Sequence, residues 1–397
     1  MTIAVIGAGA AGLMAAVSAA IHNKDAKIFL FDKNPSAGKK LLRTGSGRGN
    51  IGNEHQSISC FHGNDEDFYN KVITSHPLSF LLSVFDELNI DITVKDGYIY
   101  PRNQQAKSVR DAFITKLESL GNVRFLGSKE IISISYEKTG FVLNTDGWHY
   151  EADKVILACG GASAPDTGSD GSAYKLAQSF GHKLITPYPA LVPLVCKKDP
   201  LFKTSKERMS ASVSYKGHTA TGELQLTEYG VSGIAVFQIS RFVSMDLING
   251  EKPVISINFF PESDSDHVYD MLLKRASSGG RYILNTLLPE EMAKSIIKSN
   301  SLDSVDIPSA ESIRALSDLL TDYRLYVTDT KGFERSQVTA GGIDTSDIDP
   351  QTMGSFLRKG LYICGELLDV DGDCGGYNLQ WAFTGGYIAG EAAAADD

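Results

Sequence analysis

The sequence predicts an α/β protein in which a nucleotide-binding domain with a parallel sheet is interrupted by an antiparallel β module and a helical module. One observation behind this is the opening segment TIAVIGAGAAGLMAA, where a buried strand over Ile3–Ile6 meets G-x-G-x-x-G and a small-residue helix. Another is a change of pattern near residue 190, after which alternating apolar and polar residues indicate antiparallel strands. An apolar strand and a glycine-rich helix return at the C-terminus, so we expect both chain ends to form one domain.

Each glycine of the opening turn has a physical task. Gly7 makes the tight turn, Gly9 lets backbone N–H groups approach a pyrophosphate, and Gly12 lets the helix pack closely on the strand. The helix N-terminus faces the phosphate charge. Asp32 ends a second strand, KIFLF, and can accept hydrogen bonds from both ribose hydroxyls. The segment therefore predicts dinucleotide binding of the Rossmann type without deciding which dinucleotide; the alternative is a glycine-rich turn in an ordinary α/β unit.

The elements after the second strand are predicted from the spacing of apolar residues and from the proline and glycine residues that end helices and strands. Apolar residues at helical spacing over 66–90 predict two helices separated at Pro77. DITVKDGYIYP predicts a hairpin at Asp96-Gly97, and SVRDAFITKLESLG an amphipathic helix closed by Gly121. Several strands follow, and the last of them is a buried strand over Lys154–Ala158.

The central part of the chain predicts the inserted modules. Strands such as SASVSYKG, HTATGELQLTEYG and KPVISINFF are expected between residues 190 and 260, and helices follow, with Pro289 and Pro308 as breaks or first-turn residues. Strands return in RLYVTDTKGFERSQVTAGGID. The predicted domains are a nucleotide-binding domain of 1–189 with 336–397, a barrel-like domain of 190–260 with 319–335, and a helical domain of 261–318.

Composition limits the classes of function. A net charge of −10 over 397 residues argues against a general nucleic-acid binder, although one loop carries a local basic patch: Lys39, Lys40, Arg43 and Arg48. The five cysteines lack C-x-x-C or metal spacing, which predicts isolated thiols in a reducing compartment. No apolar run reaches membrane length, and the first residues form a functional strand rather than a signal peptide. We therefore expect a cytoplasmic protein that does not act at a membrane.

A C-terminal block, LYICGELLDVDGDCGGYNLQWAFTGGYIAGEAA, predicts the flavin half of a site. A strand over Leu361–Cys364 meets Gly365-Glu366, whose carboxylate can accept from ribityl hydroxyls. The helix that begins near Asn378 can stabilise negative charge on a reduced flavin. Gly386 and Gly390, four residues apart, predict close packing of this helix on the sheet. A buried glycine- and alanine-rich helix without a ligand is the alternative.

A third segment, VILACGGASAPDTG, ends a strand in Gly160 and Gly161, which lets the backbone pass close to a cofactor. Together with VIGAGAAGL, GKKLLRTGSGRGN, PALVPL, GELQLTEYGVSGIAVFQIS, VTAGGID and the C-terminal block, it resembles the BaiN/YhiN-type flavoprotein family, whose relatives include aminoacetone oxidase. The resemblance runs from end to end. It implies FAD in a two-dinucleotide-type Rossmann domain with a β-barrel-like insert and a helical insert.

The resemblance also implies a set of cofactor-binding residues. Those for the ADP half are Gly7, Gly9, Ala10, Gly12, Asp32 and Lys33. Those near the phosphates or flavin are Lys40, Arg48 and Asn50, and those for the ribityl chain and isoalloxazine are Gly365, Glu366, Asn378, Leu379 and Gln380. The set is completed by Ile131, Cys159, Gly160, Gly161 and Tyr377, of which Tyr377 is the aromatic candidate for lining the active site.

This chain departs from the family pattern in two segments. The family has G-G-G-R-C-N-x-T-N where this chain has GSGRGNIGN, so Gly49 and Gly52 replace a cysteine and a threonine. Cys159 stands in the threonine position of the family's L-A-T-G-G. Any role of the replaced side chains near the flavin is therefore absent.

Other groups of residues are weaker candidates for a functional site. The spacing of Asp369, Asp371 and Asp373 resembles a metal loop, but a strand precedes it and no distant acid completes it, so we expect no metal. His182 and His218 are expected at the surface or as caps. The segment with Arg335 and Gln337 either approaches the substrate or links domains.

The leading hypothesis is an FAD-dependent oxidoreductase that transfers a hydride between the flavin and a small organic substrate, over which the inserted modules form a cavity. The sequence contains neither a second G-x-G-x-x-G motif able to serve a separate nicotinamide domain nor a C-x₄-C motif, and this absence argues against a pyridine-nucleotide disulfide reductase. NAD(P)H would therefore visit the flavin only transiently, as a reductant. Oxidation of an amine by O₂, reduction of an unsaturated substrate, reduction of uridine in ribosomal RNA and a non-enzymatic flavin sensor remain alternatives. The acidic charge disfavours RNA. The sequence does not identify the catalytic acid or base.

Overall fold

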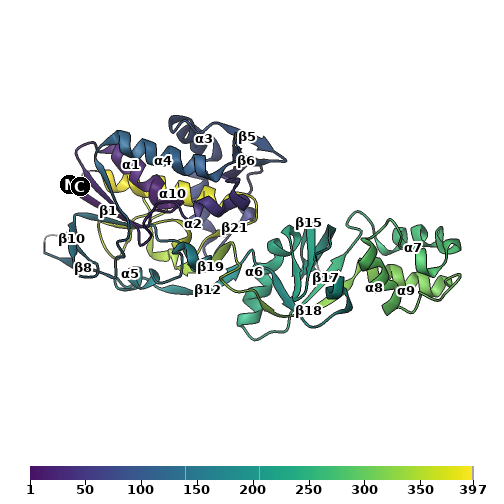
Figure 1. Cartoon of the computed structure of the whole chain (residues 1–397). Coiled ribbons are helices and arrows are strands. Elements are labelled where there is room, and N and C mark those ends of the chain that lie inside the picture. Colours follow the sequence, from purple (N-terminus) through teal and green to yellow (C-terminus); the bar gives the residue numbers. More distant parts are fainter. Residues whose placement is uncertain (139, 205, 396–397) are drawn as a thin grey trace. The chain divides into compact units, whose positions relative to one another are not determined.

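The computed structural model describes residues 1–138, 140–204 and 206–395, and the chain divides into two compact units (Figure 1). Unit 1 consists of Met1–Pro187 and Val338–Asp397, and unit 2 is Tyr188–Gln337. Both chain ends thus belong to unit 1.

Unit 1 is built on a five-stranded parallel sheet with the strand order β20-β11-β1-β2-β7. Its strands are β1 (Thr2–Ile6), β2 (Lys27–Phe31), β7 (Val123–Leu126), β11 (Lys154–Leu157) and β20 (Leu361–Ile363). β1 pairs with β2 on one side, Val5 opposite Leu30, and with β11 on the other. Because parallel strands inside the sheet are buried on both faces, they contain continuous apolar runs such as IAVI in β1 and VIL in β11.

Helices and small sheets surround this parallel sheet. The helices are α1 (Ala10–His22), α2 (Glu66–Ser75), α3 (Leu78–Glu87), α4 (Ala106–Leu120), α5 (Tyr174–Gln178) and α10 (Tyr377–Ala394). The small sheets are β8 (Ser133–Glu137), β9 (Gly140–Asn144) and β10 (His149–Ala152); β3 (Gly52–Asn53), β5 (Ile92–Lys95) and β6 (Tyr98–Pro101); β4 (Phe61–His62) and β21 (Asp371–Gly372); and β12 (Leu184–Ala190) and β19 (Val338–Ile343). Pro77 separates α2 from α3, and Gly121 closes α4 with a φ of 74°, as predicted.

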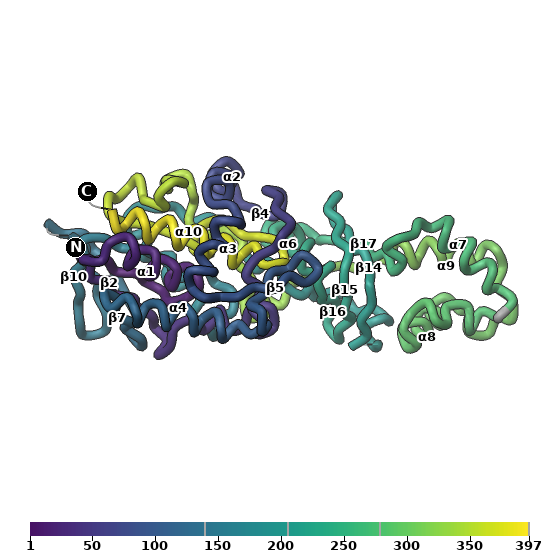
Figure 2. Tube along the Cα trace, turned by 90° about the horizontal axis from the view of Figure 1, so that it is seen from above, coloured from purple at the N-terminus to yellow at the C-terminus, as the bar shows by residue number. Residues whose placement is uncertain are grey.

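α10 packs along α1, and Figures 1 and 2 show the two helices side by side. The expectation that Gly386 and Gly390 pack α10 on the sheet is wrong. A Cβ built at Gly386 would lie 2.3 Å from the carbonyl oxygen of Ala11, and one at Gly390 would lie 2.4 Å from that of Ala15. The two glycines therefore let α10 approach another helix, because small residues four apart form one stripe on a helix.

Unit 2 contains a closed antiparallel barrel with the order β13-β16-β15-β14-β17-β18. Its strands are β13 (Leu194–Cys196), β14 (Arg208–Tyr215), β15 (His218–Thr227), β16 (Gly230–Ser232), β17 (Val254–Asn258) and β18 (Tyr323–Thr330). The helices of unit 2 are α6 (Ile234–Ile248), α7 (Ser265–Leu273), α8 (Glu290–Ser299) and α9 (Ala310–Thr321). The predicted fold class is confirmed: a Rossmann-type α/β domain, an antiparallel barrel and helices.

The sequence reading missed α6, which interrupts the β module. Its segment, IAVFQISRFVSMDLI, is apolar on most faces and contains β-branched residues, so neither period stands out. None of the helices in the described ranges has the length and apolar character needed to cross a membrane.

Candidate cofactor site

The glycine turn between β1 and α1 is shaped by steric contacts at two of its three glycines. Gly7 has a φ of 98°, and a Cβ there would lie 2.4 Å from the carbonyl oxygen of Ala158. A Cβ at Gly12 would lie 1.7 Å from the carbonyl oxygen of Gly7. A Cβ at Gly9, by contrast, would meet nothing within 4 Å, so open space lies in front of the first turn of α1. This is where a Rossmann turn receives a pyrophosphate, and the residues present fit that group.

The N-terminus of α1 is not capped by a side chain, and its first turn contains no acid. Such an N-terminus offers backbone N–H groups and a partial positive charge to an anion. Asp32 lies beside it: its Oδ2 accepts from the N–H of Ala8 at 2.8 Å, and its Oδ1 accepts from the N–H of Asn34 at 2.8 Å. These bonds fix the carboxylate at the end of β2 while Oδ2 retains a lone pair that a ribose hydroxyl can use.

Most basic residues near this turn are bound to groups of the protein itself. Lys33 pairs with Asp170 at 2.8 Å; burial alone would raise the pKa of Asp170, but the hydrogen bond from Lys33 and those at Ser172 lower it to about 2. Lys40 pairs with Glu366 at 2.5 Å. These two pairs connect the loop after β2 to distant segments of unit 1.

Lys39 and Arg43 of the basic patch both bind Asp166, the former at the backbone carbonyl and the latter at the carboxylate. Arg48 differs, since among the described residues its guanidinium bonds only within its own loop and not to a distant segment. It donates to the carbonyl of Gly45 at 3.2 Å and lies 5.5 Å from the ring centroid of Tyr100. Arg48 is therefore the cation of this patch that remains available to a phosphate or a substrate.

Glu366, which follows β20, is connected through Thr339 of β19 to the segment that follows β11. Its Oε1 accepts from the N–H of Thr339 at 2.9 Å, while Oε2 receives Lys40. The hydroxyl of Thr339 accepts in turn from the N–H groups of Ala162 and Ser163, at 2.8 and 3.0 Å. The backbone at Gly161 fits tightly beneath this network, because a Cβ there would lie 2.5 Å from Thr339 Oγ1.

Adjacent carboxyl ends of parallel strands are the usual ligand crevice of an open α/β sheet. Thr339 belongs to the VTAGGID block but was not assigned a role, because Ala162 and Ser163, whose N–H groups its hydroxyl binds, are more than 170 residues distant in sequence. Asn34, which donates to Asp32 and to the carbonyl of Thr167, was also missed; its position two residues after an aspartate at a strand end is the local signal for such a turn.

The N-terminus of α10 resembles that of α1, since both follow a glycine-rich turn. No side chain caps it, and its first turn contains no acid. The side chain of Asn378 instead holds the backbone of Gly372, with bonds of 2.8 and 2.7 Å to its N–H and C=O. A Cβ at Gly376, where φ is 101°, would lie 2.5 Å from the carbonyl oxygen of Gly52. The glycine turn thus brings β3 against the start of α10, where the N–H groups of Asn378 and Leu379 can receive an anionic ring.

Tyr377 and Gln380 are anchored inside unit 1. The Tyr377 hydroxyl donates to the carbonyl of His55 at 3.0 Å, and its ring meets the edge of Phe61 at 5.6 Å between centroids. Burial raises the pKa of Tyr377. The amide of Gln380, fully buried, donates to Gln56 at 2.8 Å. Both side chains hold the first turn of α10 in place.

Two further predicted residues, Cys159 and Ile131, are held within unit 1. The Cys159 thiol donates to the carbonyl of Ile6 at 3.2 Å, and burial raises the pKa of Cys159 to about 12, so it is not a thiolate at neutral pH. Ile131 is part of the hydrophobic core. All five cysteines are free thiols.

The prediction that His182 lies at the surface or caps a helix is wrong, because it is buried, with Nε2 2.8 Å from the hydroxyl of Ser355. His218 is exposed and stacks on Phe242 with 3.5 Å between ring centroids. His62 pairs with Asp373 at 2.8 Å. Within the residues described, no cluster of His, Cys, Asp or Glu is arranged to hold a metal ion.

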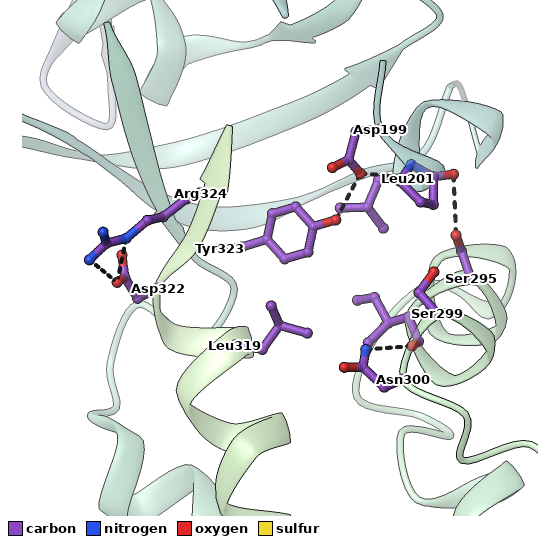
Figure 3. A pocket seen from close by; sticks show the side chains of 11 residues that line it. Asp199, Leu201, Ser295, Ser299, Asn300, Leu319, Asp322, Tyr323 and Arg324 are labelled. Carbon is purple, nitrogen blue, oxygen red and sulfur yellow. Dashed lines mark hydrogen bonds and ion pairs between the residues drawn. The ribbon is translucent and has the colours of Figure 1, made fainter. Parts of the chain in front are cut away.

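Unit 2 has a pocket of its own, with a volume of about 400 Å³, where α8 and α9 meet the barrel (Figure 3). Tyr323 points into it and donates to Asp199 at 2.7 Å, and Ser295 donates to the carbonyl of Pro200 at 3.2 Å. Its lining contains none of the predicted cofactor residues.

Comparison with known proteins gives the family. The family model described as HI0933-like protein Rossmann domain matches residues 1–392. The chain belongs to this family. The HI0933-like family is of the BaiN/YhiN type that the sequence blocks resemble, and the chain is an FAD-dependent oxidoreductase.

Two curated relatives and one solved structure are similar to this chain over nearly its whole length. The chain is 38% identical to a 3-dehydro-bile acid delta(4,6)-reductase of Clostridium scindens, over 99% of this chain and 98% of that protein. It is 28% identical to a ribosomal RNA dihydrouridine synthase of Escherichia coli, over 98% and 96%. A quinol-fumarate reductase structure with menaquinol superposes with a TM-score of 0.52 at 15% identity, covering 99% of this chain and 71% of that one, which shows a shared fold.

Proposed function

We propose that this HI0933-like protein binds FAD in unit 1 and reduces a carbon–carbon double bond conjugated to a carbonyl in a small molecule. The names of both curated relatives support this chemistry. One is a delta(4,6)-reductase of a 3-dehydro-bile acid, and the product of the other, dihydrouridine, is uridine with its ring double bond saturated next to a carbonyl. The relative with the higher identity acts on a small molecule, which favours that substrate class.

The proposed cofactor contacts follow from the uncapped N-termini of α1 and α10, both of which begin after a glycine-rich turn. The first turn of α1 with Gly9 and Ala10 receives the pyrophosphate, and Asp32 receives the adenosine ribose. Lys33, Lys40 and Arg48 supply positive charge along this path, and Glu366, beside Gly160, Gly161 and Gly365, receives the ribityl hydroxyls. The turn of α10 at Asn378 and Leu379 takes the pyrimidine edge of the flavin. Bound FAD supplies hydride transfer, and the protein supplies orientation and electrostatics.

The observation that carries the proposal is the pairing of two uncapped helix N-termini with near full-length similarity to a reductase. The test uses purified holoenzyme whose flavin is released and identified by chromatography. It is mixed anaerobically with NADH or NADPH, and flavin bleaching is followed at 450 nm. A 4-en-3-one steroid is then added. Reoxidation of the flavin with appearance of the saturated ketone is the expected result.

The same experiment separates the rival functions. Bleaching by a primary amine followed by peroxide formation in air, without reoxidation by the enone, would establish an oxidase instead. Bleaching by dithionite alone, with no turnover in either assay, would establish a flavin sensor. We place the protein in the cytoplasm, where a nicotinamide reductant and reduced thiols are both present.

Reduction of uridine in ribosomal RNA is the second candidate, favoured by the relatives named ribosomal RNA dihydrouridine synthase. The net charge of −10 opposes it, because RNA contacts rely on neutralising phosphates. The test is to incubate ribosomal RNA with the reduced holoenzyme. Formation of dihydrouridine in that RNA would establish this second function.

A further inference from the structure

Tyr98, the first residue of β6, carries a phenol that neither the fold nor the proposed cofactor contacts use. Its side chain is half-buried, and within the described part of the chain no hydrogen bond joins its hydroxyl to another group. A buried or half-buried tyrosine hydroxyl usually finds a partner. The phenol of Tyr377, by comparison, is occupied by the carbonyl of His55.

The ring of Tyr98 lies against the turn that begins α10. A Cβ built at Gly375 would be 3.2 Å from Cε1 of Tyr98 and 3.1 Å from Cε2 of Tyr377, so the two rings flank this glycine. Tyr98 pairs in register with Asn53 of β3, and the next turn residue, Gly376, packs on the carbonyl of Gly52. The ring of Tyr98 therefore lies against the glycine turn that leads into α10, and the first N–H groups of α10 are where the flavin ring is proposed to lie.

The surroundings of Tyr98 keep its phenol protonated. Burial raises the pKa of Tyr98, and the acidic groups of Cys374, Tyr100 and Asp96 raise it further. Tyr377 and Asp373 lie on the α10 side, and Lys95 is its neighbour across the hairpin. His62, also in this part of unit 1, pairs with Asp373 at 2.8 Å.

We propose that Tyr98 is the catalytic acid that protonates the α-carbon of the unsaturated carbonyl substrate. This inference rests on the proposed function. The substrate π bond accepts a hydride, with both electrons, from the reduced cofactor at its β-carbon, and the O–H bond of Tyr98 breaks as its proton joins the α-carbon. The reduced cofactor is thereby oxidised to FAD, the double bond becomes a single bond, and water returns a proton to the tyrosinate. A nicotinamide dinucleotide reduces the cofactor again.

The test compares Tyr98→Phe with wild-type holoenzyme and with Tyr100→Phe, a matched loss of a phenol two residues away on the same strand. Each protein is reduced anaerobically with dithionite and mixed in a stopped-flow instrument with a 4-en-3-one steroid or with O₂. A positioned acid contributes about 10²- to 10⁴-fold to such a step. We expect reoxidation by the enone to slow in that range for Tyr98→Phe only, while reoxidation by O₂, flavin content and enone binding to the oxidised enzyme stay within about twofold of wild type.

A second measurement uses the wild-type enzyme alone, so it holds even where Tyr98→Phe does not fold. The rate of reoxidation by the enone should stay constant up to pH about 10, the ordinary pKa of a phenol, and fall above it. The product formed in D₂O should carry deuterium at the α-carbon. Unchanged enone rates in Tyr98→Phe, or a wild-type rate that already falls well below pH 10, would overturn the role of Tyr98 while the proposed function stands. If the wild-type flavin is not reoxidised by the enone, the proposed function itself fails, and this inference fails with it.

Discussion

The glycines of the first turn show that one residue type can serve two separable purposes. At Gly7 and Gly12 the absent side chain makes room for the protein's own backbone, whereas at Gly9 it leaves space in front of α1. A sequence pattern does not distinguish these purposes. The structure does, because it shows which atoms a Cβ at each glycine would meet.

Gly9→Val and Gly12→Val should therefore fail in different ways. Gly9→Val places its side chain in open space, so the apoprotein should keep its melting temperature within a few degrees while FAD affinity falls at least tenfold. Gly12→Val forces a side chain into the carbonyl of Gly7 and should cost at least about 1–3 kcal/mol of unfolding free energy. Apoprotein melting and fluorescence titration with FAD measure both. Normal FAD affinity in folded Gly9→Val would refute the pyrophosphate assignment.

Asp32→Ala should weaken FAD binding, because the ribose loses its acceptor and the N–H groups of Ala8 and Asn34 lose their partner. Asp25→Ala is the matched control: Asp25 is an exposed residue in the loop before β2, outside the proposed site. Flavin content after purification and the dissociation constant of FAD are the measurements. Equal values in both variants would remove Asp32 from the site.

The two glycines that replace family side chains differ in how much space they leave. At Gly49, φ is 72° and a Cβ would lie 2.9 Å from Cα of Ala106. At Gly52 a Cβ would make an ordinary contact of 3.4 Å with Leu78. Gly49→Cys should thus lower the free energy of unfolding by about 1–3 kcal/mol, and Gly52→Thr by less than about 1 kcal/mol. Urea unfolding of the holoenzymes measures this; a stable Gly49→Cys would show that the loop accepts the family cysteine.

His182 makes the stability of unit 1 dependent on pH. The hydroxyl of Ser355 accepts from the N–H groups of Leu357 and Arg358, so its proton goes to Nε2 of His182, which must be unprotonated. Burial lowers the pKa of His182 below its ordinary value, and Asp347 opposes this only in part. The folded state therefore binds fewer protons than the unfolded state, and stability is complete above the unfolded pKa of about 6.5 and declines as pH falls below it.

We expect His182→Gln to flatten this dependence. The contribution of one proton is limited to about 1.4 kcal/mol per pH unit. Urea unfolding of wild type and variant at pH 7.5 and pH 5.5 measures the difference between their slopes. Parallel pH profiles would mean that other groups control stability in this range.

At the scale of elements, the contact between α1 and α10 predicts opposite effects on stability for alanine substitutions at two adjacent glycines of α10, Gly385 and Gly386. Gly386→Ala should lower the melting temperature, because its Cβ would lie 2.3 Å from the carbonyl of Ala11 and the helices would have to separate. Gly385→Ala meets nothing closer than 3.6 Å and should stabilise α10 by about 0.5–1 kcal/mol, the usual gain over glycine in a helix. Calorimetry of both variants tests this, and equal effects would contradict the packing of α10 on α1.

These elements also show how far the sequence could lead. The hairpin at Asp96-Gly97, the cap at Gly121 and the glycine turn at Gly7 depend on local backbone geometry, which a few neighbouring residues determine, and all three were predicted. The partner of Gly386 was not, because a stripe of small residues indicates close approach without naming the surface that approaches. The pairing of Lys40 with Glu366 was not foreseen either, since it joins residues 326 positions apart and depends on the complete sheet.

At the scale of the whole molecule, unit 2 is one continuous segment inserted into unit 1. Its interior is a separate hydrophobic core that includes Leu224 and Ile255 of the barrel and Leu316 of α9. The two ends of the segment lie together, because the N–H of Gln337 donates to the carbonyl of Leu191 at 3.2 Å. All residues proposed to contact FAD, in contrast, belong to unit 1.

A protein consisting of residues 188–337 alone should therefore fold, because a closed barrel leaves no exposed sheet edge and its core is complete within the segment. The expected result is a single cooperative thermal transition, a dispersed amide NMR spectrum and no bound flavin. The complementary protein, with residues 188–337 replaced by a short Gly/Ser linker, should retain FAD and lose reduction of the enone if the insert completes the substrate site. An unfolded 188–337 segment, or loss of FAD from the folded complement, would show that the two units depend on each other for more than substrate binding.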